Sequence, residues 1–235
     1  MLNVTAIPVL SDNYVWILEK DGRCAVVDPG ELEPVQKYVK ANRLKVETIL
    51  LTHHHGDHVA GVIGLAGSEV DVYSSTSDLR RIAGVTRGVS DGMTITVLDT
   101  TFTVMETPGH TVGAVCYHGA GLVFTGDTMF SAGCGRLFEG TPQEMFDSLR
   151  RLGELPEATK LYCGHEYTEK NLAFAATAEP ANTAVPKRLA EVQALRATGT
   201  PSLPSTIAIE RAVNPFLRSP DLATFTARRK ARDAF

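Results

Sequence analysis

Hydrophobic and polar positions form two kinds of pattern along the first two thirds of this chain, short apolar runs and segments with helical spacing. Short apolar runs bounded by turn-forming residues are typical of strands, and they occur at 14–18, 24–28, 46–51, 102–105, 112–117, 122–124 and 161–163. Helical spacing occurs between them at 32–42, 59–65 and 143–152, where Thr141-Pro142 provides an N-cap and a first helical residue for the last helix. The mixture predicts a layered α/β domain.

The pattern changes after about residue 166. Strand-like runs become rare, and helical spacing takes over at 168–178, 185–197 and 222–232, with prolines between the segments. We therefore predict two domains, an α/β domain over residues 1–166 and a small helical domain over residues 167–235.

Composition narrows the class of protein. The chain has 235 residues, of which 43% are hydrophobic, enough for a sizeable core, and its net charge of -4 has the wrong sign for binding nucleic acid. No apolar stretch is long enough to span a membrane, and residues 1–5 do not show the basic and apolar pattern of a signal peptide, so we expect none. The four cysteines are scattered, as expected for buried free thiols in a reducing compartment. We expect a cytoplasmic protein without nucleic-acid or membrane partners, and a monomer because no exposed apolar stripe marks an interface.

Side chains with metal-ligand chemistry are concentrated in one loop, Thr52-His53-His54-His55-Gly56-Asp57-His58. Imidazole and carboxylate groups suit zinc, iron or manganese, and a cluster without cysteine argues against a closed structural zinc site. The loop joins a predicted strand to a predicted helix, which is where open α/β sheets place their sites. Because side chains alternate in an extended loop, we expect His54 to point away from the others.

Three later strands each end in a further metal-competent residue that directly follows a glycine. These residues are His110, Asp127 and His165. Glycine permits the tight turn that directs the next side chain inward. His118 follows a strand without such a glycine and is excluded. The candidate set is His53, His55, Asp57, His58, His110, Asp127 and His165, which is too large for one tetrahedral zinc but fits two metal ions that share a carboxylate.

The order of these donors resembles the metallo-β-lactamase superfamily, which implies a four-layer αβ/βα sandwich with a small helical C-terminal domain. Within that superfamily, several segments resemble the glyoxalase II (hydroxyacylglutathione hydrolase) family: Asp12-Asn13-Tyr14, Val27-Asp28-Pro29-Gly30, the run from Ala132 to Gly140, and Cys163-Gly164-His165-Glu166-Tyr167-Thr168. The basic tail at 228–235 resembles the same family, so the similarity covers essentially the whole chain.

The resemblance assigns roles to the donors. It implies that one ion takes His53, His55 and His110, that the other takes Asp57, His58 and His165, and that Asp127 bridges them together with a hydroxide. Asp57 and Asp127 are then the candidate catalytic carboxylates. The ions are divalent, with zinc expected first and iron or manganese as alternatives.

The implied reaction is hydrolysis of a glutathione thioester. A bridging hydroxide would attack S-D-lactoylglutathione, or a related S-2-hydroxyacylglutathione, to give D-lactate and glutathione in the final step of methylglyoxal detoxification. A cysteine-type thiol has a pKa of about 8.5, so the leaving thiolate needs no dedicated general acid.

The resemblance also implies a set of contacts with glutathione, whose two carboxylates suit planar guanidinium groups. The implied contacts are Arg136, Tyr167, Arg229 and Arg232. Phe138 belongs to the same substrate-binding set, although some relatives have a tyrosine there, and Arg136 is a lysine in some relatives. Residues 220–235 carry four bases and two acids, a local balance of 4 − 2 = +2.

The sequence is also compatible with other functions. The main alternative is a persulfide dioxygenase of the same superfamily with one iron, whose relatives lack the extended helical tail. Lactonases, β-lactamases and a non-catalytic glutathione or metal-binding module are further alternatives. Asp28 either begins a turn or forms a hydrogen bond behind the metal loop, and the sequence slightly favours the turn.

Overall fold

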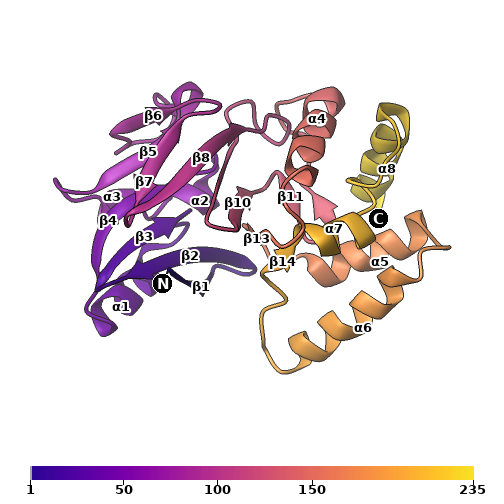
Figure 1. Ribbon diagram of the computed structural model, residues 1–235, viewed down its shortest axis with the longest axis horizontal. Coiled ribbons are helices and arrows are strands. Elements are labelled where there is room, and N and C mark those ends of the chain that lie inside the picture. The colour runs from indigo at the N-terminus through magenta and orange to yellow at the C-terminus, as the bar shows by residue number, and fades with distance from the viewer. Residues whose placement is uncertain (1) are drawn as a thin grey trace. The chain divides into compact units, whose positions relative to one another are not determined.

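The computed structural model describes residues 2–235, which divide into two compact units (Figure 1). Unit 1 comprises Met1–Glu106 and Gly113–Ala120, and unit 2 comprises Thr107–Val112 and Gly121–Phe235. The predicted boundary between residues 166 and 167 falls inside unit 2 and stays a prediction. Among residues 2–235, no helix is both long and apolar enough to cross a bilayer.

Unit 1 is built on a six-stranded sheet in the order β1-β2-β3-β4-β5-β6. Its strands and helices are β1 (Asn3–Val9), β2 (Asn13–Lys20), β3 (Arg23–Val27), α1 (Leu32–Ala41), β4 (Lys45–Leu50), α2 (Gly56–Val59), α3 (Val62–Leu65), β5 (Asp71–Ser75), the 3-10 helix η1 (Thr76–Asp78) and β6 (Arg87–Val89). An antiparallel meander follows, with β7 (Thr94–Val97), β8 (Thr100–Glu106) and β9 (Val115–Gly119).

The core of unit 1 explains why its central strands read as apolar runs. Side chains on one face of the six-stranded sheet, such as Val15 and Ile49, pack in one cluster with Val35 of α1 and Val62 of α3. The first six residues of β2 are all buried, so both faces of this strand are covered and its sequence does not alternate.

Strand direction brings the ligand loop of unit 1 to one edge of the sheet. β3 and β4 are parallel, with Val27 opposite Leu50. The residues that follow the two strands, Asp28 and Thr52, therefore meet where both strands end.

Unit 2 contains three neighbouring strands in the order β14-β13-β10, a short hairpin and most of the helices. Its elements are β10 (Leu122–Gly126), β11 (Met129–Phe130), β12 (Gly133–Cys134), α4 (Pro142–Gly153), β13 (Lys160–Cys163), α5 (Thr168–Ala178), α6 (Ala184–Ala197), β14 (Ser205–Thr206), α7 (Ile207–Val213) and α8 (Leu222–Ala234). β10 and β13 are parallel, which places Asp127 and His165 just beyond neighbouring strand ends. Thr141 and Glu144 form a capping box at the start of α4.

Most predicted elements are present, with three informative differences. The helix predicted over 59–65 is divided into α2 and α3, because the Gly61 amide between them donates to the carbonyl of Pro29 instead of extending one helix. The strand predicted from residue 112 begins at Val115. The pattern missed β1, five of whose seven residues are not fully buried, and the seven-residue helix α7, which is too short to establish a clear helical period. It also missed the short strands β5, β6, β7, β11, β12 and β14.

Candidate metal centre and adjoining pocket

The four candidate donors of unit 1 lie on the loop after β4 and in the short helix α2. Nε2 of His53 lies 3.1 Å from Nδ1 of His55, and one ligand atom of His53 lies within 4.8 Å of one of His58. The Asp57 carboxylate is 3.6 Å from Nε2 of His58. His54 instead places Nδ1 3.4 Å from the buried carboxylate of Asp78, which agrees with its exclusion from the donor set.

Asp28 organises this loop through its side chain. Its carboxylate accepts the Thr52 backbone N–H at 2.8 Å and the Thr52 hydroxyl at 2.6 Å, and it lies 3.0 Å from Nδ1 of His58. An ionised carboxylate only accepts hydrogen bonds, so the hydrogen of His58 belongs on Nδ1 and Nε2 keeps the lone pair that a metal requires. The slight preference for a simple turn at Asp28 was therefore wrong.

The same carboxylate also acts on His53 through Thr52. Because the Thr52 hydroxyl donates its hydrogen to Asp28, its oxygen accepts from Nδ1 of His53, 3.1 Å away. This places the lone pair of the His53 ring on Nε2, which faces Nδ1 of His55. One buried aspartate thus sets the tautomer of two candidate ligands.

Asp57 is held by neighbours from two other loops. The Asn13 side-chain amide donates to its carboxylate at 3.0 Å. Gly30 approaches the Asp57 backbone so closely that a Cβ at this position would lie 1.8 Å from the Asp57 carbonyl oxygen. The segments around Asn13 and Gly30 therefore support the loop by packing against it.

The three donors of unit 2 form a second cluster, and all are buried. The Asp127 carboxylate lies 3.5 Å from Nε2 of His110 and 3.3 Å from Nε2 of His165. Nδ1 of His110 donates to the backbone carbonyl of Arg136 at 2.8 Å, so Nε2 carries the lone pair. Gly135 lies against Asp127, where a Cβ would come within 2.0 Å of the carbonyl oxygen.

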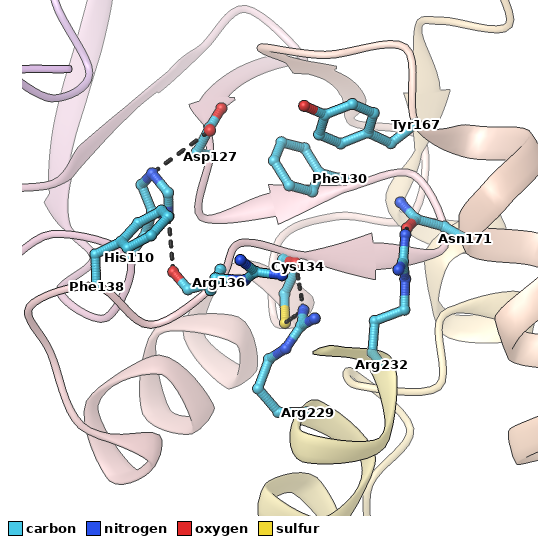
Figure 2. A pocket seen from close by; sticks show the side chains of 10 residues that line it. All are labelled: His110, Asp127, Phe130, Cys134, Arg136, Phe138, Tyr167, Asn171, Arg229 and Arg232. Carbon is cyan, nitrogen blue, oxygen red and sulfur yellow. Dashed lines mark hydrogen bonds and ion pairs between the residues drawn. The ribbon is translucent and has the colours of Figure 1, made fainter. Parts of the chain in front are cut away.

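A pocket of about 280 Å³ opens beside this second cluster (Figure 2). It is lined by His110, Asp127, Phe130, Cys134, Arg136, Phe138, Tyr167, Asn171, Arg229 and Arg232. All five residues predicted to bind substrate are among them. Phe130 and Asn171 were not predicted, because the sequence offers no motif that separates them from ordinary core positions. Cys134 lies within the motif run from Ala132 to Gly140 but was predicted only as a packed thiol.

Aromatic side chains form one side of the pocket. The ring of Tyr167 stacks on His165, with centroids 4.7 Å apart and planes 8° from parallel. Phe130 meets both rings edge-on. Phe138 is 62% exposed and meets His110 edge-on, with centroids 5.3 Å apart. The histidine donors therefore border an apolar surface.

Arginines form the opposite side and carry an excess of positive charge. Arg229 is buried and donates to the Cys134 carbonyl at 2.8 Å and to Asp233 at 3.0 Å, and Arg136 donates to the same Asp233 oxygen at 3.2 Å. Arg232 lies 3.3 Å from the Asn171 side-chain oxygen. Burial, and then the charge of Arg229, lower the pKa of Arg232. One aspartate between two of three guanidinium groups leaves the pocket suited to an anion.

The cysteines fit the predicted role of packed thiols. Cys24, Cys116, Cys134 and Cys163 are all free and buried. Cys134 borders the pocket, yet burial raises the pKa of its thiol in spite of the opposing effect of Arg229. The thiol is therefore poorly suited to act as a nucleophile.

Comparisons with known proteins identify relatives over the whole chain. A family model described as "Metallo-beta-lactamase superfamily" matches residues 9–74 and 68–165, and one described as "Hydroxyacylglutathione hydrolase C-terminus" matches residues 166–235. The chain is 42% identical to "Hydroxyacylglutathione hydrolase 2" of Vibrio vulnificus over 252 aligned positions that cover 100% of both chains.

Solved structures agree with the fold. ETHE1 from Myxococcus xanthus is 24% identical, with a TM-score of 0.72 over 98% of this chain and 90% of that one. TTHA1623, solved in a di-iron-bound form, is 24% identical, with a TM-score of 0.65 over 91% of this chain and 99% of that one. The prediction of an αβ/βα sandwich with a helical C-terminal region is confirmed. The chain belongs to the metallo-β-lactamase superfamily and, within it, to the hydroxyacylglutathione hydrolase family.

Proposed function

We propose that this protein hydrolyses S-D-lactoylglutathione and related 2-hydroxyacyl thioesters of glutathione to the free acid and glutathione. The observation that carries the proposal is the pocket of unit 2, where two candidate metal donors, His110 and Asp127, border the same cavity as three arginines. Relatives named hydroxyacylglutathione hydrolase over the full length of the chain support this substrate class.

We further propose that the donors of both units hold a pair of divalent ions. The set is His53, His55 and His110 for one ion, Asp57, His58 and His165 for the other, and Asp127 for both. The donor chemistry fits, since His53, His58 and His110 each have Nδ1 beside an acceptor, which places the lone pair that coordination requires on Nε2. Bound together, two such ions lower the pKa of a coordinated water and polarise a carbonyl.

The metals are expected to be zinc, with iron or manganese as alternatives, because histidine and carboxylate donors accept all three. The di-iron form of TTHA1623 is consistent with two sites in a related fold. Which ion is bound then depends on availability as well as on the ligands.

The protein's own residues bind and orient the substrate. Guanidinium groups of Arg136, Arg229 and Arg232 are placed to bind glutathione carboxylates, since planar forks match carboxylate geometry. The rings of Tyr167 and Phe138 offer apolar surface within the pocket, which would help to exclude water from the bound thioester. Asp57 and Asp127 remain the proposed catalytic carboxylates.

The remaining sequence predictions belong to the same proposal. The family model that begins at residue 166 supports a substrate-binding domain over 167–235 after a catalytic domain over 1–166. A reducing, cytoplasmic location is consistent with four free cysteines. We propose a monomer that binds a small-molecule thioester, with no nucleic-acid or membrane partner.

The proposal is tested by measuring thiol release from S-D-lactoylglutathione and metal content on the same purified sample, with Asp127→Ala beside it. We expect rapid release with about two metals per chain, and loss of both in the variant. One iron per chain, with oxygen consumption on glutathione persulfide and no thiol release, would assign the protein to the dioxygenases instead.

A further inference from the structure

The hairpin segment, residues 129–136, contributes to every part of the unit 2 site. Its Phe130 ring packs against His165 and Tyr167, and its Cys134 carbonyl accepts from Arg229. At its end, the Arg136 carbonyl receives the hydrogen bond of His110. The position of this segment therefore influences both the metal donors and the anion-binding arginines.

The turn of the hairpin has a conformation that needs external support. Ala132 lies at the turn with a φ of +56°, a backbone region that residues other than glycine adopt rarely. Only two residue pairs, Met129 with Cys134 and Phe130 with Gly133, join the strands. A two-stranded hairpin of this size is not stable by itself.

That support comes from Glu210 in α7, whose side chain is completely buried. Its carboxylate accepts the Ala132 backbone N–H at 2.7 Å and the Ser131 hydroxyl at 2.9 Å, both in the turn of the hairpin. It also accepts the Ser205 hydroxyl at 2.5 Å and the Asn214 amide at 3.1 Å. Four donors converge on one carboxylate, and two of them belong to the hairpin segment.

Asn214 repeats the arrangement one helical turn later. Its side-chain amide lies 3.2 Å from the Phe130 carbonyl and 2.9 Å from the Gly133 carbonyl, and it also contacts Glu210. The turn is thus attached to α7 at two points, Glu210 in the middle of the helix and Asn214 at its C-cap. The hairpin segment is held from the C-terminal helices and not only by its own strand pairing.

We infer that Glu210 is a positioning residue for the metal centre, because it holds the hairpin segment whose Arg136 carbonyl orients His110. The inference rests on the proposed metal function of His110. Its consequence is that the helical C-terminal region, beyond supplying arginines for the substrate, also sets metal affinity. Within residues 2–235, the hydrogen bonds of Glu210 go to Ser131, Ala132, Ser205 and Asn214, none of which is a proposed metal donor or lines the pocket.

Three variants test this role. Glu210→Ala removes the acceptor from all four donors. Glu210→Gln keeps one oxygen for Ala132 and Asn214, and its amide faces two hydroxyls, of Ser131 and Ser205, which rotate to accept. Ser131→Ala removes one bond and is the milder probe if Glu210→Ala does not fold. Glu179→Ala is the matched control, because Glu179 accepts from Asn182 and Arg218 without touching the hairpin segment.

The measurement is stepwise zinc affinity of folded protein at 25 °C, by competition with a chromophoric chelator, with thermal unfolding recorded alongside. We expect Glu210→Ala to weaken one zinc site about 10-fold, Ser131→Ala to weaken it about 3-fold, and Glu210→Gln to restore wild-type affinity. Glu179→Ala should lower the unfolding temperature and leave zinc affinity unchanged.

Zinc binding by the wild type and by His110→Ala distinguishes a failure of the proposed metal centre from a failure of the positioning role of Glu210. If the wild type binds two zinc ions and His110→Ala loses one, the proposed metal centre stands. Glu210→Ala, or Ser131→Ala where the former is unfolded, with wild-type zinc affinity would then overturn the positioning role alone. A wild type that binds no zinc, iron or manganese would overturn both the metal centre and the inference.

Discussion

The two sets of proposed metal donors are supported in different ways. In unit 1, four donors lie within residues 53–58, and a nearby aspartate after the adjacent strand sets the tautomers of two of them. In unit 2, the three donors come from separate loops, and His110 is oriented by a backbone carbonyl on a hairpin that α7 holds. The first set depends on local sequence and one strand pairing, whereas the second depends on long-range packing.

Removing one donor from each set should have the largest effect. We expect His55→Ala and His165→Ala each to reduce metal content from two ions to about one, and kcat for thiol release by at least about 1,000-fold, or about 4 kcal/mol. The measurement is metal analysis with steady-state kinetics. His118→Gln, on β9 and outside both sets, is the control. Full activity in either alanine variant would contradict the proposal that both units contribute donors to one metal centre.

Replacing the aspartate behind the unit 1 set should have the next largest effect. Asp28→Asn keeps a residue type that tolerates the φ of +51° but loses the charge that holds Nδ1 of His58. We expect a loss of about 10- to 100-fold in metal affinity, measured by chelator competition. Asp21→Asn, also in a left-handed conformation but on an exposed turn, provides the matched comparison. Unchanged affinity in Asp28→Asn would mean that the loop orients its histidines without help.

In the unit 2 pocket, the two arginines that share Asp233 differ in burial, and we expect their alanine variants to differ in KM. Arg229 is 7% exposed and bonded to the Cys134 carbonyl, so Arg229→Ala leaves a buried acceptor unpaired, and KM should rise about 10- to 100-fold. The Arg136 side chain is 57% exposed, and Arg136→Ala should raise KM only a few-fold. Initial rates across a range of S-D-lactoylglutathione concentrations check this order. A larger effect at Arg136 would contradict it.

The smallest expected effect is on the pH dependence of stability. Burial raises the pKa of Glu210 despite its hydrogen bonds, so its stabilising contribution is present below the unfolded pKa of 4.5 and is lost as pH rises through its folded pKa. The pKa of Glu179 is lowered, because hydrogen bonds from Asn182 and Arg218 outweigh its burial. Its contribution is present above 4.5 and is lost as pH falls through its folded pKa.

Urea unfolding from about pH 2 to pH 8 distinguishes these two carboxyls, because the loss at Glu179 lies below pH 4.5. Glu210→Gln should remove a decline in unfolding free energy with rising pH of at most about 1.4 kcal/mol per pH unit, the limit for one proton. Glu179→Gln should instead remove a decline at the acid end. Equal slopes in the wild type and both variants would show that neither group titrates across the folding transition.

Some features of the candidate site follow from the printed sequence without any knowledge of packing. His53, His55, Asp57 and His58 lie close together because they are near neighbours along the backbone. The alternation of side chains in this loop excludes His54 from the donor set. The helices α5 and α8 were predicted at their observed starts from helical spacing, and at α8 Pro220 and the Asp221 N-cap mark the boundary locally. Features that depend only on residues near one another in the sequence can be predicted from the sequence.

Other features needed the folded chain. The hydrogen bond that His58 donates to Asp28 depends on β3 and β4 being parallel and in register. A turn was therefore the better local interpretation, and it was wrong. Glu210 has no motif, and its role appears only when α7 packs against the hairpin segment. The identity of each donor is a property of the residue itself. Its tautomer, burial and hydrogen-bond partner depend on which distant segments surround it, because these interactions act through space and not along the backbone.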